Sequence, residues 1–145
     1  LIDELYQKNC SNAKIAELIK EKGYHISGRI SPGGVMYSPY AEQQTIFADA
    51  AEPKSIADLR GAGLKIYPCK KYPGSVIYGI RWLQNRKIVI DPKRTPHAWK
   101  EFTEYEYLTT KDGEFLADVP DENNHILDAC RYALDRLINN RGVSA

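Results

Sequence analysis

Residues 45–70 read TIFADAAEPKSIADLRGAGLKIYPCK, and their pattern indicates the fold class. Residues 45–48 form a short apolar run, and such a run predicts a buried strand. We expect a short helix next, capped by Ser55 and ended by Gly61 or Gly63. The closing LKIYPCK predicts a second strand. A strand, a helix and a strand in succession are typical of an α/β fold.

Outward from this stretch, helical and extended patterns continue to alternate. Residues 11–23 predict an amphipathic helix with Ser11 as N-cap and Gly23 at its end. Residues 24–44 are rich in glycine and proline and predict mostly irregular structure. The other expected elements are strands at 1–6, 87–92 and 105–108, helices at 75–86 and 95–104 capped by Ser75 and Thr95, a turn at 112–113, and a last helix from Asn123 or Asn124 to Leu137.

The composition is that of one globular domain. The chain has 145 residues, of which 43% are hydrophobic and 27% charged, and this size is typical of a single domain. No run of about 18 apolar residues occurs, so no membrane span is expected, and the acidic N-terminal region is unlike a signal peptide. Cys10, Cys69 and Cys130 form no CxxC pair, which favours reduced thiols and a cytoplasmic location.

Basic and acidic residues are segregated along the chain. Residues 65–100 contain nine bases and one acid, whereas residues 101–135 contain ten acids and two bases. A basic third beside an acidic third suits a protein that holds a polyanion on one surface and divalent cations on another. Two solvated faces would give the same pattern, so the segregation alone leaves both interpretations open.

Asp49 directly follows the apolar strand of residues 45–48. In open α/β folds the carboxyl end of a strand faces the crevice where ligands bind. An Asx turn that starts the next segment would explain the same aspartate equally well. Position alone therefore favours neither a ligand role nor a structural one.

A histidine and an aspartate stand three residues apart at the start of the last expected helix. His125 and Asp128 would share one face, with Tyr132 on the same line and Arg131 beside it. Such ligands, without thiolates, suit Mg²⁺ or Mn²⁺ better than Zn²⁺. Taken alone, the pair is better explained by an aspartate that complements the helix dipole beside a partly buried histidine. The packing stripe of this helix is expected at Ile126, Cys130, Ala133, Leu134 and Leu137.

Three segments, taken together, resemble a known family: IFADAAEPKSIADLRGAG, KKYPGSVIYGIRWLQ and NNHILDACRYAL. In order and spacing they resemble the nuclease domain of the large terminase subunit of tailed phages and prophages, and most closely its PBSX-like branch. The resemblance covers nearly all of the chain and is weakest over residues 24–44. It implies a single RNase H-like α/β domain over residues 1–145, with a mixed β-sheet flanked by helices.

The resemblance also implies a two-metal site that uses Mg²⁺ or Mn²⁺. Asp49 would bridge the metals, and His125 and Asp128 would complete the site from the last helix. Glu4 matches an acidic position on the preceding strand. Such a metal pair activates a water and stabilises the leaving oxygen of a phosphodiester. Four cations are expected to meet DNA phosphates, namely Lys54, Lys70, Lys71 and Arg81.

The family cuts concatemeric viral DNA during capsid packaging, so the resemblance implies partners as well. These are double-stranded DNA, the terminase ATPase domain, the small terminase subunit and the portal, in the cytoplasm of a bacterial host and without a membrane. No G-x-x-x-x-G-K-[ST] loop occurs in these 145 residues, and none matches the aspartate that RNase H-like nucleases take from their first strand. We therefore expect a C-terminal piece of a larger protein that lacks its first strands.

Three other functions stay open at the level of sequence. The basic segment would also suit a module that docks DNA or the portal without cleavage. Asp91 and Lys93 form an acid-x-Lys pair that, with Asp49, is typical of a restriction-type nuclease. A junction resolvase or another RNase H-like enzyme would have the same arrangement of acids. Binding of Mn²⁺ distinguishes a nuclease from a docking module.

Overall fold

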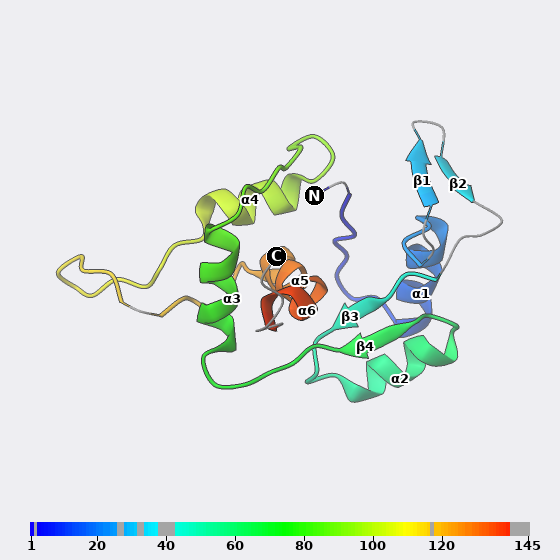
Figure 1. Cartoon of the computed structure of the whole chain (residues 1–145), viewed down its shortest axis with the longest axis horizontal. Coiled ribbons are helices and arrows are strands. Elements are labelled where there is room, and N and C mark those ends of the chain that lie inside the picture. The colour runs from blue at the N-terminus through cyan, green and yellow to red at the C-terminus, as the bar shows by residue number, and fades with distance from the viewer. Residues whose placement is uncertain (2, 26–27, 32–33, 38–42, 117, 140–145) are drawn as a thin grey trace. The chain divides into compact units, whose positions relative to one another are not determined.

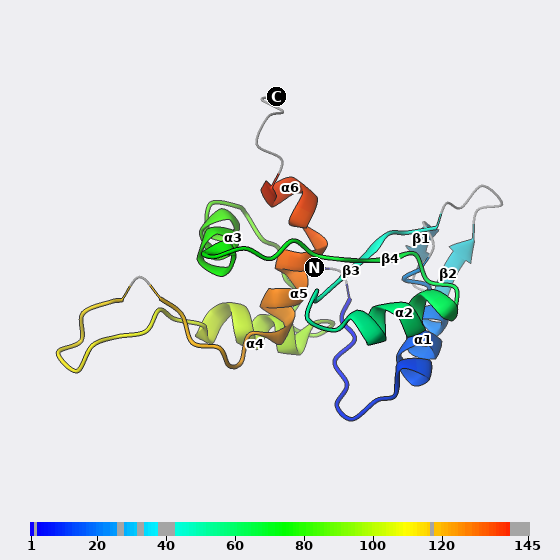
Figure 2. The ribbon, with the colours of Figure 1, turned by 90° about the horizontal axis from the view of Figure 1, so that it is seen from below.

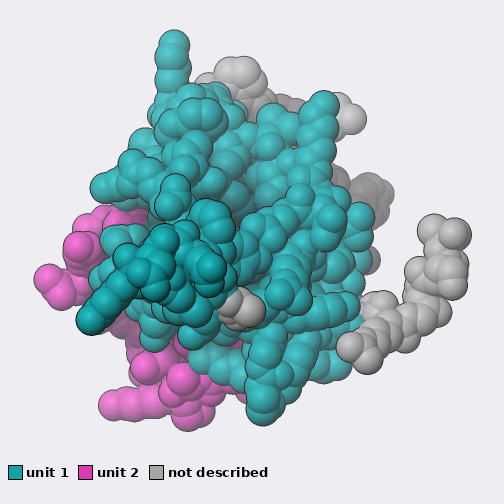
Figure 3. All heavy atoms as spheres, turned by 90° about the vertical axis from the view of Figure 1, so that its left-hand side faces the viewer, with its two compact units in different colours: residues 1–4, 70–145 teal, residues 5–69 magenta. Residues whose placement is uncertain are grey.

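The structure, a computed structural model, describes residues 1, 3–25, 28–31, 34–37, 43–116 and 118–139. The chain divides into two compact units (Figure 3). Residues 5–69 form unit 2, and residues 1–4 together with 70–145 form unit 1. Each unit has its own cluster of buried hydrophobic side chains.

Unit 2 is built around the predicted strand–helix–strand, which is confirmed (Figure 1). β3 (Ile46–Ala48) and β4 (Ile66–Pro68) pair in parallel, with Ile46 opposite Ile66. Parallel strands need a crossover connection, and α2 (Pro53–Gly61) supplies it. The other described elements of this unit are α1 (Asn12–Glu21) and an antiparallel pair formed by β1 (Gly28–Ser31) and β2 (Gly34–Tyr37).

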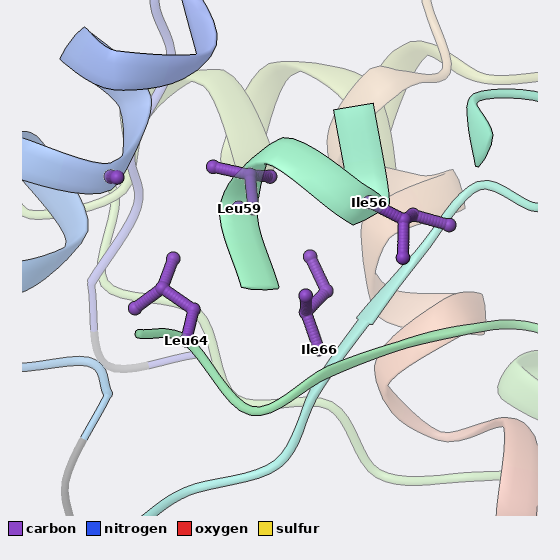
Figure 4. Close-up of a cluster of buried hydrophobic side chains, with 5 residues drawn as sticks. Ile56, Leu59, Leu64 and Ile66 are labelled. Carbon is purple, nitrogen blue, oxygen red and sulfur yellow. The ribbon is translucent and has the colours of Figure 1, made fainter. Parts of the chain in front are cut away.

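The core of unit 2 joins α1 and α2 to the parallel pair. Burial of one aliphatic side chain of this size stabilises a fold by about 1.5–3 kcal/mol, so this cluster holds α2 against β4. Four of its side chains are labelled in Figure 4. Its buried members are Ala16, Ile56, Leu59, Leu64 and Ile66.

Unit 1 is mainly helical in its described part. Its helices are α3 (Ser75–Gln84), α4 (Pro96–Glu104), α5 (His125–Ala133) and α6 (Asp135–Asn139). Ile80 and Leu83 of α3 form a buried cluster with Leu127 of α5. Between α4 and α5 lies an extended arm, residues 105–120, which carries an isolated bridge between Thr109 and Phe115 (Figure 1).

Several predicted helix and turn signals are confirmed. The Ser11 hydroxyl oxygen accepts a hydrogen bond from the Lys14 N–H at 3.2 Å, so Ser11 caps α1. Thr95 is the N-cap residue of α4. In the turn of the arm, Gly113 has φ 83°, a left-handed conformation that glycine adopts without strain.

Two predicted caps are wrong. Gly74, with φ 80°, is the N-cap residue of α3, and Ser75 is the first helical residue. Glu52 precedes α2, because Pro53 takes the first helical position, where its missing N–H costs nothing. Ser55 therefore lies inside the first turn of α2 rather than before it.

The predicted strands at 1–6, 87–92 and 105–108 are wrong, since their described residues carry no strand. The Leu1 amino group donates a hydrogen bond to the Val89 carbonyl oxygen at 2.6 Å. One hydrogen bond of this kind does not form a β-ladder, and an apolar run becomes a strand only when it pairs with another strand. Residues 24–44 were predicted to be mostly irregular, yet their described part contains the pair of β1 and β2.

The last predicted helix is divided in two. α5 ends at Ala133, and after a turn at Leu134 the chain continues as α6 (Figure 2). The predicted packing stripe is confirmed only in part, since Leu134 packs against the buried cluster of Ile80, Leu83 and Leu127. Leu127 and Arg131 are the buried residues of α5, whereas Leu137 is 62% exposed. The break at Leu134 explains the exposure of Leu137, because helical spacing does not continue through a turn.

The fold is thus mixed α/β, with six helices in the described residues and a small parallel sheet. No helix in the described part is both long and apolar enough to cross a membrane.

Candidate metal site

Asp49 is the first residue after β3. Its Oδ1 accepts a hydrogen bond from the Ala51 N–H at 2.8 Å, and its carbonyl oxygen accepts one from the Glu52 N–H at 3.3 Å. This is the Asx turn that the sequence left open. The turn uses Oδ1 and fixes the carboxylate at the carboxyl end of the parallel pair, which is where α/β proteins bind ligands. The structural role and the ligand role are therefore compatible.

The second half of the predicted site lies at the start of α5. His125 is the first residue of this helix and is exposed, while Asp128 lies in its first turn and is half-buried. Their spacing of three residues places both on one face of the helix. An imidazole and a carboxylate are thereby presented together, which fits the ligand preferences of Mn²⁺ and, through the oxygens, Mg²⁺.

Asp128 is held by an arginine of its own helix. Arg131 donates to Asp128 Oδ1 from Nε at 3.1 Å and from a terminal nitrogen at 2.6 Å. The Arg131 side chain is only 8% exposed, and its guanidinium carbon lies 5.3 Å from the centroid of the Tyr132 ring. Arg131 was expected beside Asp128 but not as its partner, although the three-residue spacing of opposite charges is a signal for this pair.

The start of α5 is capped by a carboxylate from another helix. Glu101 of α4 is buried, and its Oε2 accepts hydrogen bonds from the Ile126 N–H at 2.7 Å and the Leu127 N–H at 3.0 Å. These are two of the N–H groups that a helix start leaves without a partner. Asn124, the N-cap residue, makes no capping hydrogen bond with its own side chain. Nothing in the sequence pattern indicated Glu101, because it lies far from α5 along the chain.

Glu4 caps α4 in a similar way. Its Oε1 accepts hydrogen bonds from the His97 N–H at 3.0 Å and lies 2.7 Å from His97 Nδ1, while Oε2 accepts one from the Ala98 N–H at 2.9 Å. Burial raises the pKa of Glu4, but the hydrogen bonds from Ala98 and His97 and the His97 charge outweigh burial and lower it. The predicted place of Glu4 in a metal site stays a prediction.

The thiol within α5 is a poor metal ligand at neutral pH. Burial raises the pKa of Cys130 to about 11, and the charge of Glu101 adds to the rise against the opposing N-terminal amino group. A thiol must lose its proton to bind a metal tightly. All three cysteines are free, as predicted. The ligand chemistry at the start of α5 is therefore that of oxygen and imidazole.

The four basic residues that are predicted to contact DNA phosphates are exposed. Lys54 lies in α2, and Arg81 lies in the last turn of α3. Lys70 and Lys71 lie between β4 and α3, and the Lys70 N–H donates to Asp135 Oδ1 at 3.3 Å. Exposure is what a phosphate contact requires, and the DNA-binding role of these side chains stays a prediction.

The structure brings His125 and Asp128 together on α5. Asp49 belongs to unit 2, and the Glu4 side chain caps α4 by accepting a hydrogen bond from the Ala98 N–H. Within the described ranges, no three His, Cys, Asp or Glu side chains form a group that could hold a metal ion. His125 and Asp128 fit Mg²⁺ or Mn²⁺ chemically. As described, they form part of a ligand set rather than a complete one.

Comparison with known proteins identifies the family. A family profile described as "Terminase RNAseH like domain" matches residues 1–136. The chain is 36% identical over 146 residues to the terminase large subunit of Bacillus phage SPP1, covering 99% of this chain and 31% of that protein. It is 32% identical over 93 residues to the PBSX phage terminase large subunit of Bacillus subtilis strain 168, covering 64% of this chain and 22% of that protein. The chain thus spans less than a third of these relatives.

A solved structure is similar over almost the whole chain. It is the nuclease domain of the large terminase of bacteriophage SPP1, crystallised with bound Mn. The TM-score is 0.74 at 35% sequence identity, and the match covers 93% of this chain and 68% of the SPP1 domain. The resemblance predicted from three short motifs is therefore confirmed over nearly the full length, and the chain belongs to the family of terminase RNase H-like nuclease domains related to SPP1 and PBSX.

Proposed function

We propose that this chain is the metal-dependent DNA endonuclease part of a large terminase subunit and cuts concatemeric phage DNA during packaging. The observation that carries the proposal is the likeness to a nuclease domain that was crystallised with Mn. The placement of Asp49 after β3 and of His125 and Asp128 at the start of α5 supports it. The proposal includes an RNase H-like mixed sheet flanked by helices, and the parallel pairing of β3 and β4 supports it.

Asp49, His125 and Asp128 are the proposed ligands of Mg²⁺ or Mn²⁺, with Glu4 as a further acidic candidate. Bound in a pair, such ions would supply Lewis-acid activation of water and stabilisation of the leaving oxygen. The protein's own contribution is to hold the ligands in place. The Asx turn holds Asp49, and Arg131 holds Asp128.

The proposed substrate is double-stranded DNA, bound through its phosphates. Cations on a protein surface release the counterions of DNA, and this makes affinity strongly dependent on salt. The segment 65–100, with nine bases against one acid, supplies the charge. Further proposed partners are the terminase ATPase domain, the small terminase subunit and the portal, in the cytoplasm of a bacterial host. The proposed phosphate contacts are Lys54, Lys70, Lys71 and Arg81.

A docking module without cleavage is the second candidate, and the basic segment 65–100 favours it. Thermal unfolding with and without Mn²⁺ separates the two. A ligand that binds only the folded state raises the unfolding midpoint, so a nuclease site gives a rise with Mn²⁺ that a chelator reverses and that Asp49→Asn reduces. An unfolding midpoint that does not change when Mn²⁺ is added would favour the docking module. Glu114→Gln, which removes an exposed acid of the arm, is the matched control.

A further inference from the structure

We infer that Arg131 is a positioning residue for the metal site: its guanidinium holds one oxygen of Asp128 so that the carboxylate stands ready to receive the cation. The inference rests on the proposed function, because it concerns the ligands of the same site. It assigns a role to a residue that is neither a proposed ligand nor a proposed DNA contact.

The contacts of Asp128 divide between its two oxygens. Oδ1 accepts both hydrogen bonds from Arg131, at 3.1 and 2.6 Å. Oδ2 lies 3.5 Å from the Tyr132 hydroxyl and 3.5 Å from Asn124 Nδ2, both at the outer limit of a hydrogen bond. A charge-assisted pair on Oδ1 and weak contacts on Oδ2 mean that Oδ1 is the held oxygen. Oδ2 is the oxygen that a cation would take at small cost.

The surroundings of Arg131 show why the arginine itself is fixed. Its side chain is 8% exposed, in contrast to the 23% of Asp128. Gly79 of α3 lies against it so closely that a Cβ there would lie 2.8 Å from Arg131 Cδ. The Tyr132 ring lies 5.3 Å from the guanidinium carbon. Gly79 of α3 and the Tyr132 ring of α5 thus restrict the position of the Arg131 side chain, which in turn holds the Asp128 carboxylate.

Confinement of this kind has a functional consequence for a metal ligand. Residues that hydrogen-bond to a ligating carboxylate set its orientation, and their loss typically lowers metal affinity about 10- to 100-fold. Arginine suits the task because its planar fork can place two N–H groups on one carboxylate, whereas lysine offers only a point charge. The same positive charge also balances Asp128 before a cation arrives.

The test is the Mn²⁺ affinity of purified protein, read from the electron paramagnetic resonance signal of free Mn²⁺, together with thermal unfolding in chelator. Arg131→Lys keeps the charge and loses the fork, so we expect Mn²⁺ to bind about 10-fold more weakly. Gly79→Ala keeps both charge and fork but displaces Cδ, and we expect a smaller loss of affinity. Arg86→Lys, in which an exposed arginine 4.5 Å from the Trp82 ring is changed, is the control for the first.

Gly61→Ala is the control for the second, because a Cβ at Gly61 would meet nothing within 4 Å. Both controls should bind Mn²⁺ as the unchanged chain does. Unchanged Mn²⁺ affinity in Arg131→Lys, with only a lower unfolding midpoint in chelator, would overturn the positioning role and leave the proposed function standing. Absence of Mn²⁺ binding by the unchanged chain would overturn both.

Discussion

At the scale of single residues, charged side chains at the start of α5 and α4 are committed to specific partners. Arg131 holds Asp128, and Glu4 holds the first N–H groups of α4. From the sequence, Asp128 was open to a structural or a ligand role, and Glu4 entered the predicted site only through the family resemblance. Each pair has a consequence for stability that can be measured.

Asp128→Asn is expected to abolish Mn²⁺-dependent cleavage and also to destabilise the fold. Removing one carboxylate from a metal site usually relieves repulsion, but here it leaves the buried guanidinium of Arg131 without its counter-charge. Loss of a hydrogen bond to a charged group costs about 1.5–3 kcal/mol, and the partial exposure of Asp128 places the effect near the lower end. Urea unfolding in chelator measures it. Asp49→Asn is the comparison, because the Asp49 side chain accepts a hydrogen bond from the Ala51 N–H that an asparagine oxygen can also accept. Equal stability of both variants would contradict this expectation.

Glu4 should contribute to acid unfolding. Its folded-state pKa lies below the ordinary value of 4.5, because the N–H groups of Ala98 and His97 and the His97 ring outweigh burial. A lowered carboxyl pKa gives stability that is present above about pH 4.5 and is lost as pH falls through the folded-state value. In Glu4→Gln the loss of stability below pH 4.5 should therefore be shallower. Urea unfolding between pH 3 and 7, about the range set by carboxyl pKa values, measures this; an unchanged slope would exclude the role of Glu4.

At the scale of elements, α5 depends on α4 for its start. Its own N-cap residue, Asn124, makes no capping hydrogen bond with its side chain, and Glu101 serves two N–H groups instead. A change in α4 is therefore transmitted to the helix that carries His125 and Asp128.

Glu101→Ala is expected to destabilise the fold by about 2 kcal/mol, in the range of a lost cap or of charged hydrogen bonds. Hydrogen exchange of the Ile126 and Leu127 amides should accelerate more than that of amides in α3. Glu101→Gln retains an acceptor oxygen and should restore part of the protection. If the amides of α5 and α3 accelerated equally in the alanine variant, the cap would have no local role.

The elements also show where sequence patterns succeed. Residues 45–68 were predicted well because a short apolar run, a glycine stop and a second apolar run are local signals. The strand predicted at 87–92 failed because an apolar run needs a partner strand, which a local pattern does not report. The burial of Arg131 was missed for the same reason, since its side chain lies against Gly79 of α3.

At the scale of the whole molecule, the family was predictable and the complete site was not. The positions of Asp49 after β3 and of His125 and Asp128 at the start of α5 were predictable from local patterns, and their role in a metal site stays a prediction. The capping of α5 by Glu101 was not recognised, because it joins two helices. The hold of Arg131 on Asp128 was not recognised either, because it depends on burial of Arg131 against Gly79. The order of motifs along the chain carried more information about function than any single residue.

Nicking of supercoiled plasmid DNA in Mn²⁺ tests the proposed nuclease activity directly. The unchanged chain and Asp49→Asn are compared, each with and without chelator, and Glu114→Gln serves as the control. We expect the unchanged chain and the control to nick the plasmid in Mn²⁺, chelator to stop both, and Asp49→Asn to nick no faster than a blank. Equal nicking by the unchanged chain and Asp49→Asn, or nicking that persists in chelator, would contradict the proposed activity.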